Sequence, residues 1–258
     1  MGVVNVTPDS FSDGGRYLRV GQSIDRIHSL IEHGADIVDI GAESTCPGAD
    51  SIKPQEEITR LQPLVSELAK QGLISRISVD TSKRAVIDWA LELGVRVIND
   101  VTGGACGAVC LEGIAKTGGV YICMHMHGNP QNMQNSPLRA REALTSVGDF
   151  FRDSEQRLLA LGFSKGQYLF DPGIGFGKTD GANFQLLQMC MGLSKKYPMV
   201  VGVSRKSFIG RQLDIDSPEL RDPASKMLEV GLMLAGVQVI RTHQVGPLAR
   251  MRKLLYEE

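Results

Sequence analysis

The stretch that decides the fold is Leu93-Gly94-Val95-Arg96-Val97-Ile98-Asn99-Asp100, LGVRVIND in one-letter code. Its glycine suits the left-handed turn that ends a helix. The β-branched run that follows is typical of a buried parallel strand. Because two polar residues close the run, the stretch predicts a helix end, a tight turn, a strand and then a polar loop.

The same unit recurs along the chain. Three further copies are His33–Ile40, Gly118–His125 and Ala235–His243. Other apolar runs fit between these copies and bring the expected strands to eight; they are Val3–Val6, Arg76–Asp80, Gln167–Asp171 and Met199–Val203. The segments between the strands have helical periodicity, as at Ile24, Ile27 and Ile31.

This alternation predicts an α/β fold, a closed (β/α)8 TIM barrel, with residues 1–258 as a single domain. An open doubly wound sheet is the alternative, although it normally uses fewer strands and a single crevice. No low-complexity tract or obvious linker divides the chain.

Composition excludes several classes of function. The chain has 28 Lys and Arg against 29 Asp and Glu, a net charge of −1, which gives no electrostatic reason to bind nucleic acid or an anionic membrane. No apolar run approaches the roughly 18 to 20 residues that span a bilayer, and no secretory signal is visible at the start. We therefore expect a cytoplasmic protein without nucleic-acid or membrane partners. The five cysteines have no paired spacing and predict neither a disulfide framework nor a metal site.

Every expected strand ends in polar residues, and a barrel carries its chemistry on the loops that follow the strands. One such residue more often caps a helix or a turn, but a whole rim of them favours a shared site. The acceptors are Asp80, Asn99 and Asp171; the donors and positive charges are Lys206, Arg241 and His243, with Asn5 beside them because the first and last strands are neighbours. A matching ligand has a planar, donor-rich edge at one end and an anion at the other.

Three loops at this rim are unusual. Residues 7–15 and 42–50 are long and rich in Gly, Pro, Ser and Asp, so we expect mobile lids that close over a substrate; surface turns are the alternative, against which Phe11 argues. The glycine-rich segment Asp171–Lys178 lacks the ending of a P-loop, which disfavours nucleotide hydrolysis. His125 and His127 are expected to be structural or to line a pocket, because no third metal ligand is evident.

Nine ordered motifs, which together span essentially the whole chain, resemble the signatures of the dihydropteroate synthase family of pterin-binding barrels. They are Asn5–Gly15, Glu43–Thr45, Pro47–Ala49, Ser78–Lys83, Ile98–Asp100, Met124–Met126, Asp171–Lys178, Ser204–Ser207 and Arg241–His243. The resemblance implies a transferase that joins p-aminobenzoate to 6-hydroxymethyl-7,8-dihydropterin diphosphate, giving 7,8-dihydropteroate and pyrophosphate for folate synthesis. C–O cleavage would precede attack and give a delocalised dihydropterin cation.

The resemblance also implies a role for each matched residue. Asp171 and Asn99 would bind the pterin edge, Lys206 its carbonyl and N5 side, and Met124 and Phe176 its ring system. Asp80 would stabilise positive charge, and Asp13 would assist catalysis and seal the site. The other implied contacts are Arg241, His243 and Asn5 to the diphosphate, Asn5 to Mg2+, and Phe11, Pro47, Ser207 and Thr45 around the aminobenzoate. The family also implies a homodimer formed through helices away from the rim, and inhibition by sulfonamides.

Two features depart from the family pattern. Cys46 stands where the family usually has Arg, which removes a positive charge from the second loop. The chain also starts directly in the first expected strand, where relatives usually carry an extension, so a truncated or alternatively started form is an expectation. Two other functions stay open: a catalytically silent pterin-binding barrel, and a methyltetrahydrofolate-dependent methyltransferase, which would not need the first loop or the diphosphate clamp.

Overall fold

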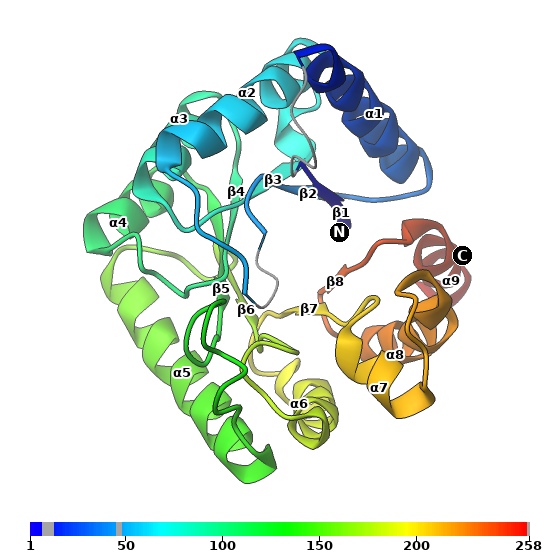
Figure 1. Cartoon of the computed structure of the whole chain (residues 1–258). Helices are drawn as coiled ribbons and strands as arrows, with labels where there is room; N and C mark the ends of the chain where they lie inside the picture. Colours follow the sequence, from blue (N-terminus) through cyan, green and yellow to red (C-terminus); the bar gives the residue numbers. More distant parts are fainter. Residues whose placement is uncertain (7–12, 45–47, 257–258) are drawn as a thin grey trace.

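A computed structural model describes residues 1–6, 13–44 and 48–256, with the side chains of residues 13–19 left out. Parallel strands form its centre and helices surround them (Figure 1). Six strands pair in chain order: β1 (Gly2–Asn5), β2 (Val38–Gly41), β3 (Ile77–Asp80), β4 (Val97–Asp100), β5 (Val120–Met124) and β6 (Tyr168–Asp171). A parallel pair, β7 (Val200–Gly202) and β8 (Val239–Arg241), follows.

Two single bridges join these sheets into a ring. Phe170 of β6 bridges to Met199, just before β7, and Gly2 of β1 bridges to Thr242, just after β8. The Thr242 amide donates to the Met1 carbonyl at 3.0 Å, which closes the seam between the ends of the chain. The predicted barrel is therefore confirmed, and the open doubly wound alternative is wrong.

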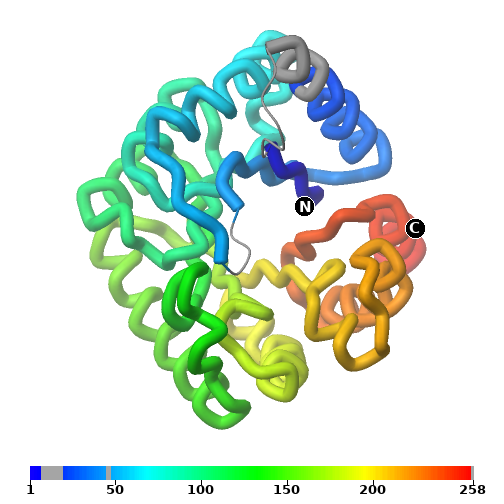
Figure 2. The backbone as a smooth tube through the Cα atoms, viewed as in Figure 1, coloured from blue at the N-terminus to red at the C-terminus, as the bar shows by residue number. Residues whose placement is uncertain are grey.

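The helices lie outside the ring of strands, as the backbone trace shows (Figure 2). They are α1 (Asp13–Glu32), α2 (Pro54–Lys70), α3 (Arg84–Glu92), α4 (Ala108–Lys116), α5 (Ala140–Ala160), α6 (Asp180–Leu193), α7 (Ser207–Leu213), α8 (Asp222–Leu234) and α9 (Val245–Tyr256), with short 3-10 turns η1 (Ile74–Arg76) and η2 (Glu219–Arg221). No helix in the described ranges is both long and apolar enough to cross a membrane. The first expected loop is shorter than predicted, since α1 already begins at Asp13.

Glycine ends the helices as the sequence predicts. Gly94 has φ of 96° and its amide donates to the Leu91 carbonyl, while the next amide, of Val95, donates to the carbonyl of Ala90. These two bonds satisfy carbonyls at the end of α3 and turn the chain directly into β4. The strand is thereby placed with its polar end at the barrel mouth.

Alternation along β4 explains how the site is supported. Ile98 packs in the large apolar layer between strands and helices, whereas Val97 belongs to a small apolar cluster with Ile122 and Val200. Successive side chains of a strand point to opposite faces, so Val97 and Asn99 share the interior of the barrel. An apolar plug therefore fills the barrel beneath a polar layer that includes Asn99.

Candidate active site

The predicted rim residues converge at the carboxyl ends of the strands. A small cavity there is lined by acceptor, donor and apolar side chains that come from the six strands β3 to β8 or their following loops: Asp80, Asn99, Met124, Asp171, Phe176, Lys206 and Arg241. A wider hollow continues from it and shares Asp80, Phe176, Lys206 and Arg241, adding Asn5, Ser204, Ser207 and His243. The sequence thus correctly predicted which strand ends meet, although the role of each residue stays a prediction.

Arg241 lies between two acidic side chains at the centre of this site. Its Nε donates to Oδ2 of Asp39 at 2.8 Å, and its Nη2 donates to Oδ2 of Asp80 at 3.3 Å. The same oxygen of Asp39 accepts from Nδ2 of Asn99 at 2.9 Å. Donors and acceptors are therefore in direct contact here, so the expectation that they occupy opposite ends of the rim is wrong for Arg241.

The charge of Asp80 depends on this arrangement. Burial, together with the nearby carboxylate of Asp39, raises the pKa of Asp80 to about 8, and the charge of Arg241 opposes that rise. Asp80 is thus a carboxyl group whose ionisation is unusually sensitive to what else binds at the mouth. Asp39 lies within the expected strand unit His33–Ile40, and its contact with Arg241 was not predicted from the sequence.

Asp171 ends β6 inside the small cavity. Its Oδ1 accepts from the Gly173 amide at 2.7 Å, and its Oδ2 has no hydrogen-bond partner among the described residues. Burial raises the pKa of Asp171, while the Gly173 bond and the charge of Lys206 act in the opposite direction. One oxygen therefore fixes the side chain, and the other is available to a ligand.

Lys178 holds the loop after Asp171 and was missed as a site residue. The side chain is 2 % exposed, and its Nζ donates to the carbonyls of Gly173 and Phe176 at 2.9 Å each and of His125 at 3.3 Å. Burial lowers the pKa of Lys178 to about 7. This clamp joins the glycine-rich segment that carries Asp171 and Phe176 to the residue that follows β5. The sequence offered only a lysine at the end of a glycine-rich loop, which gives no sign of burial.

Lys206 and Phe176 form one wall of the cavity. The Nζ of Lys206 lies 4.3 Å from the centre of the Phe176 ring, a cation–π contact. Ser207 directly follows as the first residue of α7. The wall therefore offers a positive charge and an apolar face side by side.

His243 differs from the expectation of a positive charge. Its Nδ1 lies 3.0 Å from Oγ of Ser204, and the residue is partly buried. Burial and the charges of Arg205 and Arg241 lower the pKa of His243 to about 4. At neutral pH the ring is uncharged, so His243 would contact an anion by hydrogen bonding rather than by charge.

The stem of the second loop is anchored by an ion-pair cluster. Lys83 Nζ lies 2.6 Å from Oε2 of Glu43 and 2.5 Å from Oε2 of Glu57, and the Ile52 amide donates to Oε1 of Glu43 at 2.9 Å. Thr45, Cys46 and Pro47 of this loop lie outside the described residues, as does Phe11 of the first loop. Asp13 begins α1, but its side chain is not described, so the lid hypothesis stays a prediction.

His125 has the structural role expected from the sequence. Its Nε2 lies 2.9 Å from Oγ of Ser146, and its ring meets Phe150 edge-on. Burial lowers the pKa of His125 to about 3. Among the side chains described, no group of three or more His, Cys, Asp or Glu could hold a metal ion.

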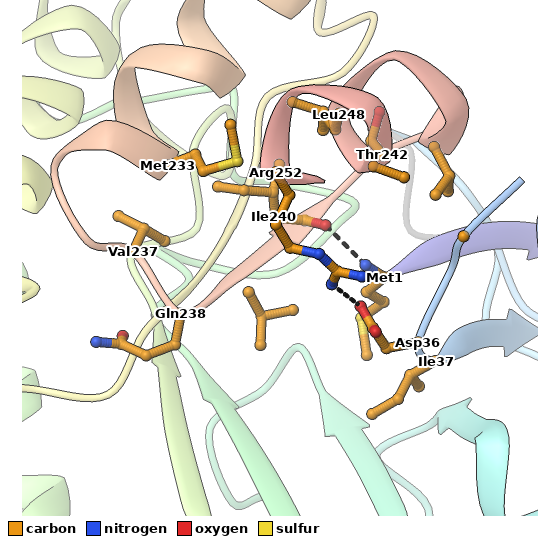
Figure 3. A pocket seen from close by; sticks show the side chains of 14 residues that line it. Met1, Asp36, Ile37, Met233, Val237, Gln238, Ile240, Thr242, Leu248 and Arg252 are labelled. Carbon is orange, nitrogen blue, oxygen red and sulfur yellow. Dashed lines mark hydrogen bonds and ion pairs between the residues drawn. The ribbon is translucent and has the colours of Figure 1, made fainter. Parts of the chain in front are cut away.

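A further cavity opens at the other end of the barrel (Figure 3). It is lined mostly by apolar side chains of β8, α8 and α9, together with the ion pair of Arg252 and Asp36 at 2.7 Å. The Met1 amino group donates to the Ile240 carbonyl beside it. None of the predicted site residues lines this cavity, so the polar mouth is the candidate active site.

Comparison with known proteins identifies the family of the chain. Residues 1–243 match the family model described as pterin binding enzyme. The dihydropteroate synthase of Escherichia coli is 38% identical to the chain, an alignment that covers 95% of the chain and 86% of that protein. The chain belongs to the dihydropteroate synthase family. It is accordingly an enzyme of the transferase class.

Solved structures of family members extend the match to three dimensions. The Xanthomonas albilineans dihydropteroate synthase with 4-aminobenzoic acid superposes with a TM-score of 0.87, at 33% identity over 98% of this chain and 91% of that one. The Anaplasma phagocytophilum enzyme with bound 6-hydroxymethylpterin-monophosphate gives 0.86, at 33% identity over 98% and 97%. The family's fold is therefore present throughout the chain.

Proposed function

We propose that the polar mouth of the barrel joins p-aminobenzoate to 6-hydroxymethyl-7,8-dihydropterin diphosphate and releases pyrophosphate. The observation that carries this proposal is the meeting of Asp171, Asn99, Lys206 and Arg241 around one small cavity. A reduced pterin has adjacent N–H donors on one edge, and its diphosphate is an anion. The relatives that bind 4-aminobenzoic acid and a pterin monophosphate support the same pair of substrates.

The pterin edge is bound by Asp171 and Asn99. The second oxygen of Asp171 accepts from two adjacent donors as a charge-assisted pair. Asn99 has committed one Nδ2 hydrogen to Asp39, so it offers its Oδ1 and a second hydrogen to the ring. Met124 and Phe176 pack against the ring faces, and Lys206 reaches the carbonyl and N5 side.

The diphosphate is bound in the wider hollow by Arg241, His243 and Asn5. Arg241 uses Nε and Nη2 on its acidic neighbours, which leaves Nη1 without a hydrogen bond to any described residue. A guanidinium held in this way presents its remaining donors in a fixed direction. His243 adds a neutral N–H donor.

The donor set of the hollow also suits Mg2+. Asn5 is exposed at the end of β1 and lines the hollow with Arg241 and His243. An amide oxygen is a normal Mg2+ ligand, and this ion commonly completes its shell with waters and substrate phosphates. Bound there, Mg2+ would neutralise charge on the diphosphate. Asn5 is the described residue that we propose as its protein ligand.

The chemistry proceeds by early cleavage of the C–O bond. The pair of electrons leaves with pyrophosphate, whose charge Arg241 partly neutralises. Positive charge then spreads over the dihydropterin, next to the carboxylate of Asp80, which stabilises it. The neutral aniline nitrogen of p-aminobenzoate attacks the exocyclic carbon and loses a proton. This route needs no covalent enzyme nucleophile.

The aminobenzoate site adjoins this chemistry. Ser207 lies at the start of α7 and lines the hollow beside Lys206. We propose that Phe11, Thr45 and Pro47 complete the site from the two lids, and that Asp13 assists catalysis and seals it. The substrates are small molecules, and we propose a cytoplasmic location.

We also propose a homodimer formed through the outer face of α8. Met227 and Leu234 of α8 and Leu220 of the preceding turn η2 recur every seven residues, and they are 79%, 59% and 67% exposed. A stripe of this kind, away from the mouth, is suited to a second copy of the chain. Met227→Glu should shift the molar mass in light scattering from dimer to monomer, and an unchanged mass would reject this face.

A coupled assay for pyrophosphate release tests the function. With both substrates and Mg2+ we expect release that depends on p-aminobenzoate, together with dihydropteroate found by mass spectrometry. Pterin binding without any release would favour the catalytically silent barrel. Methyl transfer from methyltetrahydrofolate without pyrophosphate release would favour the methyltransferase.

A further inference from the structure

Arg205 has a backbone conformation that non-glycine residues rarely adopt. Its φ is 61°, and the only other non-glycine residue with positive φ in the described part of the chain is Asp214. Arg205 lies between two residues of the mouth, Ser204 and Lys206. The left-handed conformation is unfavourable for a residue with a Cβ atom, so it persists only where its surroundings impose it.

The residues that hydrogen-bond to Arg205 belong to one segment, which consists of η2 and the start of α8. Its guanidinium makes two bonds to Asp222, from Nε to Oδ1 and from Nη2 to Oδ2, each 2.8 Å. Its backbone amide donates to Oγ of Ser225 at 3.0 Å, and its carbonyl accepts from Nη1 of Arg221 at 3.1 Å. Side chain, amide and carbonyl are thus all held from the same side.

The segment that contacts Arg205 is itself held by further hydrogen bonds. Ser225 is fully buried, and its Oγ donates to the Arg221 carbonyl at 2.8 Å. Arg221 also donates through Nε to the Ile215 carbonyl at 3.0 Å. Asp222 is 7% exposed and also accepts from Nε2 of Gln244, in the loop after β8. The frame therefore connects the turn after β7 with the segment that follows His243.

The turn at Arg205 determines where Lys206 points. The Lys206 amide donates to the Val203 carbonyl at 3.2 Å, which closes the reversal around Arg205. From there the Lys206 side chain crosses Gly175 and places its Nζ over Phe176. A residue that left the left-handed region at position 205 would swing the following side chain away from this wall.

We propose that Arg205 is a positioning residue, locked by Asp222, Ser225 and Arg221 so that Lys206 is aimed at the pterin. This inference rests on the proposed function, because it assumes that the cavity binds a pterin. Arg205 itself needs no contact with the ring. The segment η2–α8, outside the barrel mouth, thereby becomes part of the recognition of the substrate.

The test uses two substitutions that both delete the ion pair but differ in backbone preference. Glycine adopts the left-handed region freely, whereas alanine does not. We expect Arg205→Ala to weaken the binding of 6-hydroxymethylpterin about tenfold, and Arg205→Gly to weaken it clearly less. The matched control is Arg211→Ala, which removes another two-bond pair, with Asp180, on α7 but outside the turn. The control should bind the pterin like the unsubstituted chain.

A double-mutant cycle separates positioning from general damage. In a Lys206→Ala background, Arg205→Ala should lower the pterin affinity by less than about twofold, because the residue through which it acts is gone. Calorimetry gives the affinities and circular dichroism the folded fraction; if Arg205→Ala does not fold, Asp222→Asn takes its place in the cycle.

The inference would be overturned if Arg205→Ala bound the pterin as tightly as the unsubstituted chain. It would also be overturned if Arg205→Ala lowered the pterin affinity equally in the unsubstituted chain and in the Lys206→Ala background. Either result would leave the proposed function intact. Failure of the unsubstituted chain to bind the pterin would instead reject the proposed function, and this inference with it.

Discussion

Arg241 of β8 reaches across the barrel interior to Asp39 of β2, with 2.8 Å between Nε and Oδ2. The strand β1 lies between them in the ring. Asp39 is 1% exposed and its Oδ1 has no hydrogen-bond partner among the described residues, so Arg241 and Asn99 supply its stabilising contacts. One carboxylate thereby links a residue proposed for the pterin edge to a residue proposed for the diphosphate.

Arg241→Ala should therefore have two effects. Binding of pyrophosphate should weaken more than binding of 6-hydroxymethylpterin, because the anion loses its charged donor. The free energy of unfolding should also fall by about 3 kcal/mol, since Asp39 and Asp80 are left buried without their cation. Titration calorimetry and urea unfolding measure the two effects. Arg252→Ala, which breaks an exposed Arg–Asp pair at the other end of the barrel, is the control. Equal losses for both ligands would contradict the clamp.

Asp171→Ala should abolish detectable pterin binding. The ring donors would lose an ionised acceptor in a buried site, and leaving such donors unpaired costs about 1–3 kcal/mol each. Asp171→Asn keeps the shape but loses the charge, so an intermediate affinity is expected. Calorimetric titration of both variants is the measurement, and unchanged affinity in Asp171→Ala would refute the pocket assignment.

The raised pKa of Asp80 predicts an unusual pH profile. Because the proposed role needs the carboxylate, kcat/KM should rise with pH and level off above about 8, where the free enzyme is ionised. Asp80→Asn should lower kcat/KM about 100-fold and should abolish its rise with pH. Titration of the substrate is the same in both proteins, so the difference between their profiles isolates Asp80. An identical rise in both would show that another group titrates.

The raised pKa of Asp80 should have the opposite effect on stability from its effect on activity: a higher pH favours activity but lowers stability. The folded protein keeps the Asp80 proton to higher pH than the unfolded chain, so the free energy of unfolding should fall as the pH rises between about 4 and about 8. Asp80→Asn should flatten that slope in urea unfolding.

Lys178→Met should lower the free energy of unfolding by about 2–4 kcal/mol, because three buried carbonyls lose their shared hydrogen-bond donor. Pterin affinity should fall as well, since the released loop carries Asp171 and Phe176. Urea unfolding and calorimetry are the measurements. Lys165→Met, at an exposed position, should change neither quantity; a Lys178→Met protein that behaves like this control would show that the clamp is dispensable.

Cys46→Arg restores the residue usual in the family. It should leave pterin affinity unchanged and raise turnover or lower the KM for p-aminobenzoate, because the added charge belongs to the second loop, which we propose to close over the aminobenzoate site. Steady-state kinetics with each substrate varied in turn decide this. Constant values for both parameters would mean that the departure is neutral.

The strands were predictable because their signals are local. In LGVRVIND the glycine, the β-branched run and the polar end occupy eight consecutive positions, and the structure contains β4 there. Strand ends were less predictable: Val6 and Val203 were expected in strands and lie just outside them. That residues 1–258 form one domain stays a prediction.

The contacts within the site were predictable only in part. Closure of the barrel brings Asp80, Asp171 and Arg241 together, so their convergence follows from topology. The pairing of Arg241 with Asp39 joins residues 202 positions apart and depends on the length and direction of one side chain. Burial of Lys178 depends on three carbonyls that only the folded loop assembles, and the left-handed Arg205 has no sequence signal because glycine or asparagine is usual there.

The most direct test of the central claim is a crystal structure with a pterin diphosphate analogue and p-aminobenzoate bound. The account predicts the donor edge of the ring within hydrogen-bond distance of Asp171 and Asn99, with the diphosphate at Arg241 and His243. A ring bound outside this cavity, or bound in the reverse direction with its phosphates at Asp171, would contradict it.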